Sequence, residues 1–208
     1  MQAQFIKAVE EAVNRVIRDF QDDSNRYWNE RDIHWCLFRH LKNQPVFQQD
    51  YFTEIIRAEF PTRRVYGEKG GKGGARGHYD LVVLDPDLLN TPDVRAMTPW
   101  TPWSECIHLM EVIVAVEIKA WSDRWQKIDQ RIHFDIRKLT CAKNAVKHPY
   151  FLNFVQLDFS RDEMEVYYRK FRKHLEGVSS RKPQLKILCA PSDPEVQPQS
   201  DYWISAPQ

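Results

Sequence analysis

The feature that most constrains the fold is a run of mostly apolar residues at 107–119, IHLMEVIVAVEIK. It is rich in valine and isoleucine, which favour strands. A strand that is apolar at consecutive positions has to be covered on both faces, and helices usually provide that cover. The run therefore predicts the central strand of an α/β domain.

Other segments supply the helices and strands that such a sheet needs. Apolar residues recur at three- and four-residue steps at 3–20 and at about 30–43, which predicts two amphipathic helices, the second with Asn29 as its N-cap. The remaining expected elements are helices at 123–147 and 162–175, and strands at 52–60 (ended by Pro61), 78–85, 150–159 and 184–190. The glycine-rich residues 67–77 and the Pro- and Trp-rich residues 86–106 are expected to be irregular.

This order of elements predicts one α/β domain with a mixed central sheet at residues 1–190, followed by a proline-rich tail at 191–208. The hydrophobic content of 42% is enough for a packed core. No apolar run reaches the roughly 20 residues of a membrane-spanning helix, and the first residues do not resemble a signal peptide. We therefore expect a cytoplasmic protein without a membrane partner. The four cysteines are scattered, which favours reduced, buried thiols over structural zinc.

Two acidic residues and a lysine stand where a buried strand would not favour them. Glu117 and Lys119 end the apolar run two positions apart, so they project from the same face, about 7 Å from each other. Asp80 stands inside the apolar strand YDLVVL. Burial of such charges is costly unless they are paired or bind a metal. A Glu–Lys ion pair at a strand end, with Asp80 exposed on an edge, is the purely structural explanation.

These residues resemble the motif of the PD-(D/E)XK, or restriction-endonuclease-like, nuclease superfamily. The matching residues are Glu30 on the early helix, Asp80 in HYDLVVL, and Glu117-Ile118-Lys119 in VAVEIKAW. The element order over residues 29–159 is similar to the αβββαβ core of that superfamily, and DIRKL at 135–139 is suggestive of it. Tyr79 replaces the proline of the motif. The resemblance implies a restriction-endonuclease-like fold with an extra N-terminal helix and a C-terminal helix–strand extension.

The matched residue types fit metal-assisted hydrolysis of a phosphodiester, which needs a neutralised phosphate and an activated water. Oxygen ligands from Asp80 and Glu117 suit Mg²⁺ or Mn²⁺. The resemblance implies the backbone carbonyl of Ile118 as a further ligand. Lys119 would hold the attacking water and stabilise the developing charge. Glu30 would complete the acidic site, although an acidic residue in a first helical turn is also ordinary helix-dipole chemistry.

A local basic stretch points to a nucleic-acid partner, whereas the net charge of +1 does not. The cations of this stretch are Arg63, Arg64, Lys69, Lys72 and Arg76. Such a stretch contacts phosphates in some proteins and is a solvated loop in others. We expect the substrate to contact Lys69, Lys72 and Arg76, and also Gln126 on the helix that follows the E-x-K triplet.

The function predicted from these features is a magnesium-dependent endonuclease that acts on double-stranded DNA. Two alternatives stay open. The chain could be a nucleic-acid-binding or protein-interaction module with the same fold and little catalysis, or an enzyme that cleaves RNA. A homodimer and another protein partner are both compatible with the sequence.

Overall fold

The computed structural model describes residues 1–48, 54–66, 75–96, 101–102, 106–121, 128–155, 166, 169 and 185–192. Its centre is a five-stranded sheet with the strand order β1-β2-β3-β4-β5. The strands are β1 Ile56–Tyr66, β2 Ala75–Leu84, β3 Val112–Trp121, β4 His148–Val155 and β5 Lys186–Pro191. β1, β2 and β3 are antiparallel neighbours, while β3, β4 and β5 run parallel. The predicted mixed sheet is confirmed, with β3 in the middle.

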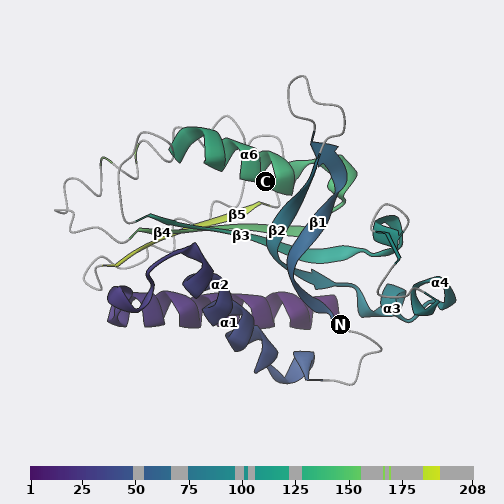
Figure 1. Cartoon of the computed structure of the whole chain (residues 1–208). Helices are drawn as coiled ribbons and strands as arrows, with labels where there is room; N and C mark the ends of the chain where they lie inside the picture. Colours follow the sequence, from purple (N-terminus) through teal and green to yellow (C-terminus); the bar gives the residue numbers. More distant parts are fainter. Residues whose placement is uncertain are drawn as a thin grey trace.

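Helices cover both faces of this sheet, as the apolar β3 requires. α1 (Gln2–Asp22) and α2 (Glu30–Lys42) lie on one face, and α6 (Ile128–Thr140) lies on the other (Figure 1). Every side chain of β3 from Val112 to Ile118 is buried. The α/β layering is therefore confirmed.

The two early helices form for the reasons that the sequence indicates. In α1 the side chains at the predicted three- and four-residue steps are all buried, namely Phe5, Val9, Ala12, Val16 and Phe20. In α2 the predicted N-cap is present, because the Asn29 side chain accepts a hydrogen bond from the Arg31 N–H at 2.8 Å. The Asp32 carboxylate accepts one from the Asn29 N–H at 3.1 Å. These two bonds satisfy donors that a helix start leaves unpaired.

The prediction that Pro61 ends the first strand is wrong. β1 begins at Ile56, continues through Pro61 and ends at Tyr66, and its register against β2 shifts between Pro61 and Val65. β1 is an edge strand, where proline is tolerated because its missing N–H is not needed for the ladder. Glu59, two residues earlier, has a left-handed backbone with φ of 49°. The strand thus accommodates the proline by local irregularity.

Residues 86–95 are more ordered than predicted, and the central strand begins later. Proline starts two short helices, α3 (Pro86–Leu89) and α4 (Pro92–Arg95), because its fixed φ suits the first helical turn. The first residues of the apolar run form a 3₁₀ helix, η3 (Ile107–Leu109), before β3. The described residues also form the 3₁₀ helices η1 (Ser24–Arg26), η2 (Pro45–Phe47) and η5 (Ala142–Asn144).

The long helix predicted at 123–147 ends at Thr140, because buried Asn144 holds the chain in a turn. The Asn144 side-chain amide donates to the Lys138 carbonyl at 2.8 Å, and its oxygen accepts from the Arg64 N–H at 2.8 Å. The next residue, Ala145, has a left-handed backbone. Pro149 was expected to precede the next strand, yet it lies inside β4.

Several predicted elements lie wholly or partly outside the described residues. These are the glycine-rich stretch up to residue 74, the start of the helix at 123–147, most of the helix at 162–175, and the tail after 192. Gly77, predicted to be irregular, is part of β2. Within the described part of the chain, none of the helices combines the length and apolar character needed to cross a membrane.

Candidate active site

Asp80 and Glu117 lie beside each other on adjacent strands. Leu81 of β2 pairs with Val116 of β3 in an antiparallel ladder, so the next pair of positions along it is Asp80 and Glu117. Directly opposed residues of an antiparallel pair project from the same face. The backbone N–H of Ile118 donates to Asp80 Oδ2 at 2.6 Å. The Asp80 carboxylate is therefore anchored where the regular β2–β3 pairing stops.

Lys119 connects this strand to two helices. Its Nζ lies 3.1 Å from Asp135 Oδ2 on α6 and 3.3 Å from Glu30 Oε1 at the start of α2. It also donates to the Ile118 carbonyl at 2.8 Å. The Lys119 ammonium thus has three oxygen neighbours from three different elements. In the purely structural explanation Glu117 would be its ion-pair partner, but Glu117 is paired with another lysine.

That second lysine is Lys138, on α6. Its Nζ lies 2.7 Å from Glu117 Oε1 and 3.0 Å from Asp135 Oδ1, and it donates to the His78 carbonyl at 2.5 Å. Asp135 and Lys138 are one helical turn apart in the DIRKL segment, so both reach the sheet. The sequence drew attention to this segment, but it did not predict that the segment supplies two charged groups to the site.

The site is largely removed from water. Relative exposure is 1% for Glu117, 5% for Lys138, 7% for Asp135 and 8% for Lys119. Asp80 is partly buried, and the Glu30 side chain is 41% exposed. Burial at this level makes electrostatic interactions strong and unpaired charge costly.

Burial and mutual repulsion shift the pKa values of the acidic residues upward. Burial raises the pKa of Glu117 well above its ordinary value, and the Asp80 carboxylate raises it further. Burial also raises the pKa of Asp80 and that of Glu30, although Lys119 opposes the shift in both.

The lysines shift in the direction that keeps them charged. Burial disfavours the Lys119 ammonium, but the surrounding carboxylates outweigh burial and raise the pKa of Lys119. The pKa of Lys138 rises because Glu117 and Asp135 outweigh burial in the same way. Both sets of shifts have one cause in common besides burial. Because the carboxylates outnumber the ammonium groups, the carboxylates repel one another and also stabilise the charged lysines.

Among the described residues, the cluster has more acidic than basic groups. When all six groups are ionised, the four carboxylates of Glu30, Asp80, Glu117 and Asp135 face two ammonium groups, which leaves a charge of −2. Glu117 Oε1 is buried and makes no contact with hydrogen-bond geometry to the described residues, although Lys138 lies at ion-pair distance. A buried carboxyl oxygen with Lys138 as its described partner, in a cluster whose described carboxyl groups outnumber its ammonium groups, is a candidate ligand for a hard divalent cation.

The carboxylates are nevertheless not drawn together as a closed metal site. Among the described residues, the group of three side chains whose possible metal-ligand atoms all lie within 4.8 Å of one another is Asp19, Cys36 and His40, none of which belongs to this cluster. Around Lys119 and Lys138 the carboxylates are held apart by the ammonium groups that lie between them. Asp80, Glu117 and the Ile118 carbonyl are the oxygen donors of β2 and β3 that could hold an ion.

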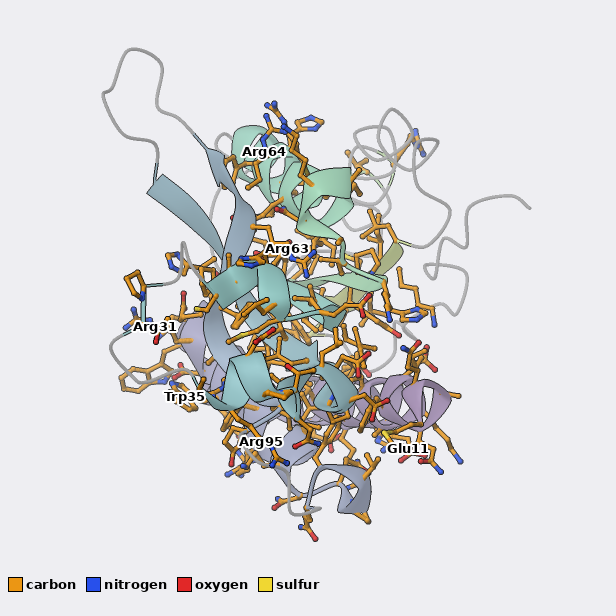
Figure 2. The ribbon with its side chains drawn as sticks, turned by 90° about the vertical axis from the view of Figure 1, so that its right-hand side faces the viewer. Glu11, Arg31, Trp35, Arg63, Arg64 and Arg95 are labelled. Atoms are coloured by element: carbon orange, nitrogen blue, oxygen red, sulfur yellow. The ribbon has the colours of Figure 1, made fainter. Side chains whose placement is uncertain are left out.

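The residues predicted to contact substrate are only partly described. Lys69, Lys72 and Gln126 lie outside the described residues, and for Arg76 only the backbone, in β2, is described. The two other cations of the basic stretch, Arg63 and Arg64, are labelled in Figure 2 and contact distant parts of the chain. Arg63 donates to the Met110 carbonyl at 2.6 Å, and Arg64 contacts Cys141 Sγ at 3.6 Å.

Known proteins add no information about this site. Comparison of the chain with family models, with curated proteins and with solved structures gives no match.

Proposed function

We propose that this chain is a magnesium-dependent nuclease of the PD-(D/E)XK type, acting on double-stranded DNA as an endonuclease. The observation that carries the proposal is a largely buried cluster in which four carboxyl groups face two ammonium groups, built from Glu30, Asp80, Glu117, Lys119 and the α6 pair Asp135 and Lys138. A network that served only to hold the fold together would be expected to balance its buried charges.

The oxygen donors fit Mg²⁺ or Mn²⁺ better than softer metals. Asp80 and Glu117 supply carboxylates, and the Ile118 carbonyl supplies a third oxygen beside them. A bound divalent ion would neutralise phosphate charge and lower the pKa of a bound water. Lys119 now donates to the Ile118 carbonyl, so this contact and a metal ligand at the same oxygen are alternatives.

Lys119 can act as a positive donor and not as a base. Its raised pKa keeps the ammonium charged at neutral pH, so it can orient a water and stabilise charge that develops on phosphorus oxygens. Lys138 contacts Glu117 and Asp135 at the same time, so its role is to position the acidic residues. Glu30 is the most exposed of the carboxylates and lies within reach of Lys119.

The element order supports the same proposal. α2, β1, β2, β3, α6 and β4 occur in the αβββαβ order that the resemblance implies, with the short helices α3 and α4 between β2 and β3. The acidic residues matched by the resemblance stand on α2, β2 and β3. The competing function is a nucleic-acid-binding module that keeps the cluster as a structural ion network. That function is favoured by the observation that both lysines already contact carboxylates.

The deciding experiment measures cleavage and binding separately. Plasmid, linear duplex, single-stranded DNA and RNA are incubated with the protein in Mg²⁺, Mn²⁺ or EDTA. We expect metal-dependent cleavage of duplex DNA that EDTA abolishes. Lys119→Ala should retain DNA in a gel shift in Ca²⁺ but cut it about 10²–10³-fold more slowly in Mg²⁺.

A matched control is Lys147→Ala, because Lys147 also pairs with carboxylates, at 3.1 Å from Glu111 and 3.7 Å from Asp85, but away from the site. This variant should cut at the wild-type rate. A wild-type protein that binds DNA and cuts none of the substrates in either metal would favour the binding module. Cleavage of RNA alone would keep the chemistry and change the substrate.

A further inference from the structure

A second group of metal-ligand side chains lies between α1 and α2. Asp19 stands in the last turn of α1, and Cys36 and His40 stand one helical turn apart on α2, which crosses α1 (Figure 1). His40 Nε2 lies 2.8 Å from Asp19 Oδ2, and Cys36 Sγ lies 3.7 Å from the same oxygen. The three ligand atoms all lie within 4.8 Å of one another.

These distances are close to those of a tetrahedral site. Zinc binds thiolate sulfur at about 2.3 Å and imidazole nitrogen or carboxylate oxygen at about 2.0–2.2 Å, so tetrahedral ligand atoms are separated by roughly 3.3–3.7 Å. The sulfur–oxygen separation already has this value. The distance between Asp19 Oδ2 and His40 Nε2 would need to increase by only about 0.5 Å to admit an ion.

An Asp–His ion pair between two helices is the simplest explanation of the Asp19–His40 contact, but it does not require a thiol. Here the thiol is buried beside the pair, with Cys36 8% exposed, and the Tyr27 hydroxyl lies 3.4 Å from its sulfur. Such an outer partner orients a ligand in many metal sites. The side chains of Asp19 and His40 are 35% and 18% exposed, so an ion and a water can reach them.

We propose that Asp19, Cys36 and His40 form a binding site for a borderline divalent cation such as Zn²⁺, with water as the fourth ligand. Binding would replace the Cys36 thiol proton, so affinity should fall in acid. The scattered cysteines gave no sign of this site, because it uses one cysteine and takes its carboxylate from another helix. An ion here would tie α2, which presents Glu30, to α1.

The test is a titration of the full chain with Co²⁺, which reports sulfur ligation through a thiolate-to-metal charge-transfer band. We expect one equivalent to produce this band and visible bands of tetrahedral intensity. The charge-transfer band should be absent in Cys36→Ser. The Co²⁺ affinity measured from the band should be at least tenfold weaker in His40→Gln. Cys141→Ser is the matched control, because Cys141 also forms no disulfide but precedes η5, away from α1 and α2. This variant should behave as wild type.

Asp80→Asn separates this site from the proposed magnesium site and should also keep the band. As a second readout, Zn²⁺ at about 100 times its Kd should raise the Tm of wild type by about 5–10 °C and leave that of Cys36→Ser unchanged. Absence of a thiolate band in wild type would overturn the proposal. So would a band that survives in Cys36→Ser or that disappears in Cys141→Ser.

Discussion

The burial of Glu117 predicts how the stability of the metal-free protein depends on pH. The pKa of Glu117 is raised above 4.5 in the folded state. At pH values between 4.5 and the raised pKa, the folded protein therefore keeps a proton on Glu117 that the unfolded chain has released. Over that window the free energy of unfolding falls as pH rises. One proton gives a slope of at most about 1.4 kcal/mol per pH unit. For a chain of this size the Tm should fall by about 3–6 °C per unit.

Thermal unfolding in EDTA, followed by circular dichroism from about pH 5 to pH 8, measures this slope. Glu117→Gln has no proton to bind at this position, so its Tm should depend less steeply on pH than that of wild type. Glu11→Gln changes an exposed carboxylate of α1 that pairs with Lys7, and it should keep the wild-type slope. Parallel curves of Tm against pH for wild type and Glu117→Gln would refute the reasoning.

Two further predictions concern the same cluster. Magnesium affinity, measured by calorimetry, should fall more than about tenfold in Asp80→Asn, and undiminished binding in this variant would place the ion elsewhere. In wild type, magnesium binding should release a proton, so the measured heat should depend on the ionisation enthalpy of the buffer. Lys138→Met should lower the free energy of unfolding by about 3–5 kcal/mol in urea with EDTA, because it leaves Glu117 without its buried partner and leaves Asp135 paired with Lys119 alone. The exposed Lys143→Met is the control, and an equal loss in both variants would show that the Lys138 pairing is not special.

The sequence predicted those features that depend on neighbouring residues. The periodicity of α1, the Asn29 cap of α2 and the apolar β3 are local patterns, and the structure has all three. The alternation of side chains along β3 also placed Glu117 and Lys119 on one face. Asp80 could be included because it stands inside the apolar strand YDLVVL, where an unpaired charge is costly, and because the family resemblance matched it.

Features set by distant contacts could not be predicted in the same way. The end of α6 depends on Asn144 bonding to the backbone of Arg64, which is 80 residues away. Pro61 would stop a central strand, and only its place on an edge explains why β1 continues. A Glu117–Lys119 ion pair was the purely structural alternative, but Glu117 pairs with Lys138 of α6. No pattern in the sequence of β3 indicates this partner.

The irregular backbone of β1 has a consequence for how the protein behaves at high concentration. An edge strand offers free N–H and C=O groups to a strand of another molecule, which is a common route to aggregation. Along β1 an added strand would meet Pro61, which has no N–H, and Glu59, whose backbone turns to a φ of 49°. Continuous pairing on this side is therefore interrupted at its middle, and β1 protects the sheet against growth by strand addition.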